Sequence, residues 1–178
     1  MVVAQSSNDL QSGFGGQRAK RSLTAAIAAS RPGDRIWVTA GTYRPNDEAP
    51  SIRWFEMKNE IAIYGVFSGT ESVLEQRDPW MNRTILSGDL LGDDADNDLD
   101  GLPDPDTMVD NAWHVFFHPE SLGLNQSTRL DGFTICGGNA SGSSRAQKLG
   151  GEIYNRPCDQ QPRPLSRTAP SKADSKTG

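Results

Sequence analysis

The chain of 178 residues lacks the features that define several protein classes. No apolar run approaches the roughly 20 residues that cross a bilayer, so no transmembrane segment is expected. Residues 1–4 lack the basic region and apolar stretch that begin a signal peptide. No basic stripe with interleaved aromatic residues is present, so nucleic acid is not an expected partner.

Cysteine is scarce, and its two positions exclude a framework of disulfides. Cys136 lies in an apolar stretch and Cys158 in a Pro-rich one. We expect a buried thiol and an incidental thiol rather than a Cys136–Cys158 disulfide.

Hydrophobic residues make up only 35% of the chain, whereas 18 glycines and 11 prolines indicate many turns. This composition favours short strands over long helices, and the length suits one domain. Three β-forming runs, at residues 36–38, 61–65 and 84–88, begin 25 and then 23 positions apart. A strand repeat of roughly 20–50 residues is typical of a solenoid.

The expected elements fill the middle of the chain. Residues 19–30 form a capping helix, because Leu23 and Ile27 lie at helical spacing and Pro32 follows. Residues 60–67 are apolar on both faces, which predicts a buried, parallel strand. Further strands are expected at residues 114–118 and 130–136. The domain would then span residues 19–155, between a flexible lead-in (1–18) and a disordered tail (156–178).

Several strings along this domain resemble a known family. They are PGDRIWVTAGTY at residues 32–43, IYGVFSGTE at 63–71, TILSGD at 84–89 and LDGFTI at 130–135. They are similar to the N-terminal cap and first rungs of bacterial right-handed parallel β-helix repeat proteins of the pectin-lyase-like superfamily. The resemblance implies an all-β right-handed parallel β-helix. It also implies more rungs than this chain holds, so we expect a truncation or frameshift after about residue 155.

The net charge of −5 has one local origin. Residues 89–106 hold eight aspartates and no lysine or arginine, so the remainder of the chain carries +3. An acidic insertion at residues 89–110 argues for a cation site more than for general repulsion.

The sharpest motif in this insertion is DNDLDGLPD at residues 96–104. Aspartates at positions 1, 3 and 5, a glycine at 6, a carbonyl at 7 and an oxygen at 9 match a calcium loop. The predicted Ca²⁺ ligands are Asp96, Asp98, Asp100, Leu102 and Asp104. Thr107 replaces the glutamate expected at position 12, and prolines forbid an exit helix, so the alternatives are a helix-free calcium loop and a solvated acidic loop.

Other candidate residues have simpler interpretations. His114 and His118 share one strand face, and a metal pair would need further His or carboxylate ligands from another rung, so stacked or surface histidines are the better interpretation. Arg77 and Asp78 are expected to fix a turn by pairing. The four tryptophans could form a sugar-stacking platform, although packing is the expected role for most of them.

These observations favour a non-catalytic β-helix segment of a secreted or cell-surface bacterial protein. Its role would be structural or adhesive, with a calcium-binding loop and with polysaccharide or cell-surface proteins as partners, and its open last rung predicts edge-to-edge self-association. The alternative is the N-terminal part of a pectin-lyase-like polysaccharide lyase or hydrolase. The nearest constellation to such a lyase site is Asp89, Asp93 and Asp94 with Arg83.

Overall fold

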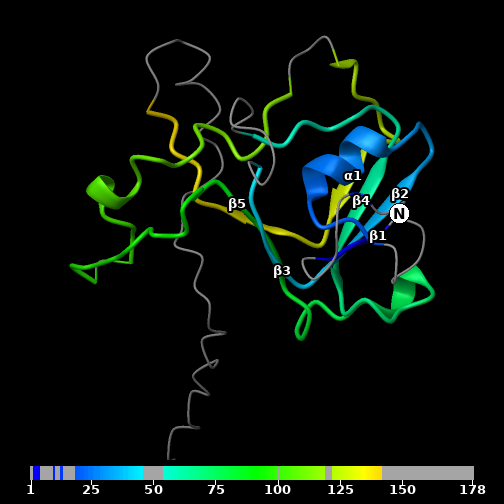
Figure 1. The fold of residues 1–178 in the computed structure, drawn as a ribbon, viewed down its shortest axis with the longest axis horizontal. Coiled ribbons are helices and arrows are strands. Elements are labelled where there is room, and N and C mark those ends of the chain that lie inside the picture. The colour runs from blue at the N-terminus through cyan, green and yellow to red at the C-terminus, as the bar shows by residue number, and fades with distance from the viewer. Residues whose placement is uncertain are drawn as a thin grey trace, which may run out of the picture.

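The computed structural model of the chain describes residues 2–4, 10, 13, 19–45, 54–99, 101–118 and 122–141 (Figure 1). These residues build two small parallel sheets and one α-helix. The predicted tail at residues 156–178 lies outside them. Of the predicted lead-in, Val2–Val3 forms strand β1.

From β2 onward, successive strands along the chain alternate between the two sheets. The first sheet has the order β1-β2-β4-β6, and the second has the order β3-β5-β7. All of their pairings are parallel. The strands are β2 (Arg35–Thr39), β3 (Gly41–Tyr43), β4 (Ala62–Phe67), β5 (Thr84–Ser87), β6 (Arg129–Asp131) and β7 (Thr134–Cys136).

Strand β4 is the centre of the first sheet. It pairs with β2 on one side and with β6 on the other, and Ile63 is fully buried. Its partners and its burial confirm the buried parallel strand that apolar residues on both faces predict. Ile36, Val38 and Leu86 pack into the same core.

Helix α1 (Leu23–Ala29) lies inside the predicted range of 19–30 and is shorter than it. Ser22 caps its start, because the Ser22 hydroxyl accepts a 3.1 Å hydrogen bond from the backbone N–H of Ala25. The buried side chains of Leu23 and Ile27 join the core beside β1 and β2.

The prediction of an all-β right-handed parallel β-helix is wrong. The described residues combine α1 and two 3₁₀ turns (Leu74–Gln76 and Pro105–Thr107) with two small sheets, and no closed solenoid forms. The three evenly spaced runs are not equivalent repeats: β2 and β4 pair with each other, whereas β5 pairs with β3 in the second sheet. Spacing along the sequence does not specify which strands pair.

Two predicted strands also differ from the structure. Residues 114–118 form no strand and contribute one isolated bridge, between Phe116 and Phe55. Residues 130–136 divide into β6 and β7, because Gly132 between them adopts a left-handed φ of 83°. The chain thereby passes from the first sheet to the second within a few residues.

Candidate metal centre

The acidic insertion leaves the second sheet at the end of β5 and returns to the same place. The backbone N–H of Ala112 donates a 2.7 Å hydrogen bond to the carbonyl of Gly88. The N–H of Asn139, after β7, donates in turn to the carbonyl of Ala112 at 2.8 Å. The two ends of the insertion are therefore held side by side by backbone hydrogen bonds.

Gly88 permits this arrangement because it has no side chain. Its N–H donates to the carbonyl of Cys136 at 2.9 Å, and a Cβ on Gly88 would overlap the backbone of Gly137. The residue just before the insertion is thus fixed directly against the turn that follows β7.

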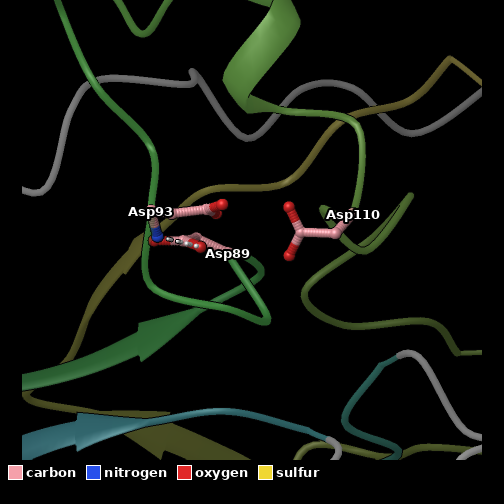
Figure 2. Close-up of side chains that lie close together, drawn as sticks. All are labelled: Asp89, Asp93 and Asp110. Atoms are coloured by element: carbon pink, nitrogen blue, oxygen red, sulfur yellow. Dashed lines mark hydrogen bonds between the residues drawn. The ribbon is translucent and has the colours of Figure 1, made fainter.

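Three carboxylates meet where the two ends of the insertion come together. One oxygen from each of Asp89, Asp93 and Asp110 lies within 4.8 Å of the others. Figure 2 shows the carboxylate of Asp110 pointing toward those of Asp89 and Asp93 across the gap between the two chain segments. We call Asp89, Asp93 and Asp110 the aspartate triad.

Backbone donors fix two of the three carboxylates of the triad. Asp89 Oδ1 accepts hydrogen bonds from the N–H groups of Gly92 at 2.6 Å and Asp93 at 3.2 Å. Asp110 Oδ2 accepts from the N–H of Leu91 at 2.9 Å. These bonds close the 89–93 turn and tie it to the returning segment.

Arg44, just after β3, contacts the backbone of the 89–93 turn. Its Nε donates a 2.6 Å hydrogen bond to the carbonyl of Asp89. A Cβ on Gly92 would lie 2.6 Å from an Arg44 terminal nitrogen, so glycine lets the guanidinium lie against the turn. Arg44 places positive charge beside the triad while it bonds to backbone.

Asp94 and Asn111 extend the cluster. Asn111, only 3% exposed, donates a 3.0 Å hydrogen bond from its side-chain amide to Asp94 Oδ2. The remaining oxygen of each side chain is buried without a hydrogen-bond partner. Desolvation, together with the charges of the aspartate triad, raises the pKa of Asp94 above its ordinary value, although the bond from Asn111 opposes this.

This arrangement can hold a metal ion. Its donors are all oxygens, chiefly carboxylates, which suit hard cations such as Ca²⁺, Mg²⁺ and Mn²⁺ rather than Zn²⁺ or Cu⁺. Buried acceptor oxygens without hydrogen-bond partners are costly, and those of Asp94 and Asn111 belong to the residues next in sequence to Asp93 and Asp110 of the triad.

The predicted calcium loop shares one feature with the triad region, because Asp96 Oδ1 is also buried without a hydrogen-bond partner, but its other contacts differ. Asp96 Oδ2 accepts from the N–H of Gly101 at 3.0 Å, and Asp104 Oδ2 accepts from Asn97. Asp98 and Leu102 are exposed, and Asp100 lies outside the described residues. Within the described part of the chain, Asp96, Asp98 and Asp104 do not form a group like the aspartate triad.

The two histidines considered as metal ligands pack against aromatic rings. His114 stacks on Phe117 with ring centroids 5.7 Å apart, and His118 lies 5.4 Å from Phe116. Burial lowers the pKa of His118, although a backbone hydrogen bond and the charge of Glu56 oppose this.

Arg77 does not pair with Asp78. Its guanidinium forms a 2.8 Å ion pair with Asp131 of β6 and lies over the ring of Tyr64. Asp78 instead closes a turn, since its carboxylate accepts from the N–H groups of Trp80 and Met81.

Two further expectations concern Trp and Cys residues. Trp37 stacks on Phe67 at 4.7 Å, and Trp54 packs against Phe117, whereas Trp80 is 89% exposed. Cys136 is disulfide-bonded, so the expectation of a free buried thiol is wrong there. Cys158 lies outside the described residues.

The structure brings together only some of the residues that were considered as the nearest constellation to a lyase site. Asp89 and Asp93 meet, and Asp94 adjoins them, but Arg83 donates to the hydroxyl of Thr134 on β7. Asp110 was not among the predicted ligands. It follows Asp93 by 17 positions, and only its place at the end of the acidic insertion could have indicated it.

No family model, curated protein or solved structure matches this chain. The resemblance to pectin-lyase-like repeat proteins therefore stays a prediction. Within the described residues, no helix has the length and apolar character needed to cross a membrane.

Proposed function

We propose that the acidic insertion binds one Ca²⁺ ion at the aspartate triad, and that this ion joins the two ends of the insertion. The role is structural and non-catalytic. The observation that carries the proposal is the meeting of Asp89 and Asp93 with Asp110, which lie on opposite ends of the insertion. Three carboxylates at this separation repel one another unless a cation lies between them.

A second observation supports a ligand at this place. Asn111 is almost fully buried beside the triad, yet its Oδ1 has no hydrogen-bond donor, and neither has Oδ1 of Asp94. Buried acceptors of this kind are normally satisfied by protein, water or an ion. Asp94 is also the carboxylate on which the triad's charges act, so a cation there would relieve both problems.

Calcium fits these groups better than magnesium. Ca²⁺ accepts six to eight oxygen ligands in flexible geometry, whereas Mg²⁺ demands near-ideal octahedral geometry and keeps several waters. A cluster of carboxylates on irregular backbone, with a neighbouring amide oxygen, matches the looser requirement. Three to four carboxylates on such backbone suggest a Kd of about 10⁻⁴–10⁻³ M, the range of extracellular modules.

An extracellular or cell-surface location is part of the proposal. Calcium sites of this affinity are filled where calcium is abundant, and the disulfide at Cys136 persists in an oxidising compartment. Polysaccharide or cell-surface protein remains the proposed partner.

Calorimetric titration of the chelator-treated full chain with CaCl₂ and with MgCl₂ tests the proposal. We expect saturable calcium binding with one ion per chain and at least tenfold weaker magnesium binding. Asp110→Asn should weaken calcium binding about tenfold or more, since it removes one charged ligand.

Asp106→Asn is the matched control, because Asp106 is an exposed aspartate of the same insertion outside the triad. It should leave the affinity within about twofold. If both substitutions weaken calcium binding equally, the loss reflects only the reduced negative charge of the insertion, and the site at the triad is rejected.

A further inference from the structure

A second feature is a pocket whose lining residues are distinct from the aspartate triad. The pocket of about 180 Å³ is lined by side chains of β1, β2 and the end of β4, and by the loop that follows β4. Its volume is below the roughly 300 Å³ at which small-molecule sites begin. It therefore suits a group the size of one side chain.

One wall of the pocket is apolar. Trp37 and Phe67 stack with ring centroids 4.7 Å apart and an interplanar angle of 8°, and Val2 lies beside Trp37 in the register of β1 and β2. Phe67 is 1% exposed, so the stack is anchored in the protein. Such a wall accepts a short aliphatic stem.

The outer rim carries a fixed negative charge. Glu71 closes the loop after β4: its Oε1 accepts from the N–H of Ser68 at 2.6 Å, and its Oε2 accepts from the N–H groups of Gly69 and Thr70 at 2.8 and 3.0 Å. Burial opposes ionisation, but these hydrogen bonds outweigh it and lower the pKa of Glu71 from its ordinary 4.5. The carboxylate is therefore held in place and ionised at neutral pH.

The rim still has acceptor capacity. The carboxylate of Glu71 accepts three backbone hydrogen bonds, and the side chain of Ser68 also contributes, but its negative charge has no cationic partner among the described lining residues. The hydroxyl of Ser72 donates to Gln76 Oε1 at 3.3 Å, which leaves its own lone pairs available. No described lining residue is basic. The ligand must therefore supply both the positive charge and the hydrogen-bond donors.

We propose that this pocket binds a primary alkylammonium group, with the aliphatic stem against Trp37 and Val2 and the ammonium at Glu71 and Ser72. A primary ammonium has three donors, so it can use both rim acceptors. A quaternary ammonium has none, and a neutral alcohol lacks the charge that Glu71 complements. A lysine side chain of another protein and a free amine present the same chemistry.

The test uses the full chain, ¹⁵N-labelled, and follows the Trp37 indole N–H and the Gly69 amide by NMR. n-Butylammonium should shift both signals saturably, and tetramethylammonium and 1-pentanol should bind at least about fivefold more weakly. This comparison of ligands leaves the protein unchanged, so it does not depend on a variant that folds. Equal binding of the three probes, or no saturable shift with n-butylammonium, would overturn the proposal.

Variants locate the charge. Glu71→Gln should weaken n-butylammonium binding about tenfold or more, the effect of losing a charged hydrogen bond. Glu75→Gln removes an exposed carboxylate outside the described pocket lining and should change it less than twofold. Because Glu71 also closes its loop, Ser72→Ala provides a milder second variant, with an expected loss of about two- to fivefold. Loss of binding in Glu75→Gln equal to that in Glu71→Gln would contradict the assignment.

One further probe identifies the source of the group. Nα-acetyl-lysine methylamide should match n-butylammonium within about threefold if the pocket accepts a lysine from a protein partner. A tenfold weaker affinity would assign the pocket to free amines, with the same chemistry at Glu71.

Discussion

Asn111 Nδ2 donates a 3.0 Å hydrogen bond to Asp94 Oδ2, and the second oxygen of each side chain is buried without a donor. The pair stands beside the aspartate triad, whose charges act on Asp94. The hydrogen bond from Asn111 therefore leaves the carboxylate of Asp94 only partly satisfied beside the triad, and the two side chains do not complete a satisfied polar network.

The first prediction concerns the pH dependence of stability without metal. The folded pKa of Asp94 is raised above its ordinary 3.8, so the folded chain binds this proton more tightly than the unfolded chain does. The free-energy cost of keeping Asp94 ionised in the folded chain is fully present at neutral pH, and it disappears as the pH falls through the folded pKa. In EGTA, Asp94→Asn should therefore increase the free energy of unfolding at pH 7, and this gain should shrink toward pH 4.

Urea unfolding at pH 7, 5 and 4 measures this difference between the variant and the parent chain. Asp98→Asn, an exposed aspartate of the same insertion, should show little change across the series. With saturating calcium the sign should reverse at pH 7, because Asp94→Asn then removes a charge that the ion stabilises. A gain that stays constant with pH would show that Asp94 is not the titrating group.

The second prediction concerns Gly88. A Cβ at this position would overlap the backbone of Gly137, which cannot move without disturbing the end of β7. Gly88→Ala should lower the free energy of unfolding by about 1–3 kcal/mol, the usual effect of overpacking. It should also weaken calcium binding, because the hydrogen bond between Ala112 and Gly88 sets the approach of the two ends.

Denaturant unfolding and calcium titration of the same variant check both effects. Glu75→Ala, at an exposed surface position, should stay within about 0.5 kcal/mol of the parent. An unchanged calcium affinity in a destabilised Gly88→Ala chain would mean that the insertion is positioned independently of β5.

The third prediction concerns Arg77, which links the loop after β4 to β6. Its ion pair with Asp131 is 2.8 Å long, and the two side chains are 20% and 40% exposed. Its guanidinium also lies 5.2 Å from the centroid of the Tyr64 ring. Partly exposed ion pairs contribute about 0.2–1 kcal/mol and exposed cation–π contacts about 0.5–1 kcal/mol, so Arg77→Ala should cost about 0.7–2 kcal/mol.

A double-mutant cycle with Asp131→Asn separates the two contacts. The coupling energy between Arg77→Ala and Asp131→Asn should stay below about 1 kcal/mol and decrease in high salt. If the coupling energy equals the whole loss of unfolding free energy in Arg77→Ala, the contact with Tyr64 contributes nothing to stability.

Sequence reasoning predicts the local features of the fold well where side-chain pattern alone decides them. Apolar residues on both faces of residues 60–67 indicate β4, and Leu23 and Ile27 indicate α1. The overall fold class was wrong because the even spacing of strands does not say which strands pair. Gly132, read as part of one strand, instead turns the chain between the two sheets.

The candidate site was predictable only as a region. The concentration of aspartates indicates a cation site within residues 89–110, and the alternating motif directs attention to Asp96, Asp98 and Asp104. The triad instead joins Asp93 to Asp110, whose proximity depends on backbone hydrogen bonds at Gly88 and Ala112. No local spacing rule encodes such a meeting.

Equilibrium dialysis with ⁴⁵Ca²⁺ decides whether one ion binds at the aspartate triad, because it counts the bound ions and two double variants locate them. With the expected Kd of about 10⁻⁴–10⁻³ M, the parent chain and Asp98→Asn/Asp104→Asn should each bind about 0.5–0.95 ion per chain at 1–2 mM calcium and approach one ion at higher concentration. Asp89→Asn/Asp110→Asn should bind essentially none. If Asp89→Asn/Asp110→Asn binds calcium like the parent chain and Asp98→Asn/Asp104→Asn loses binding, the ion does not bind at the triad and belongs to the 96–104 loop.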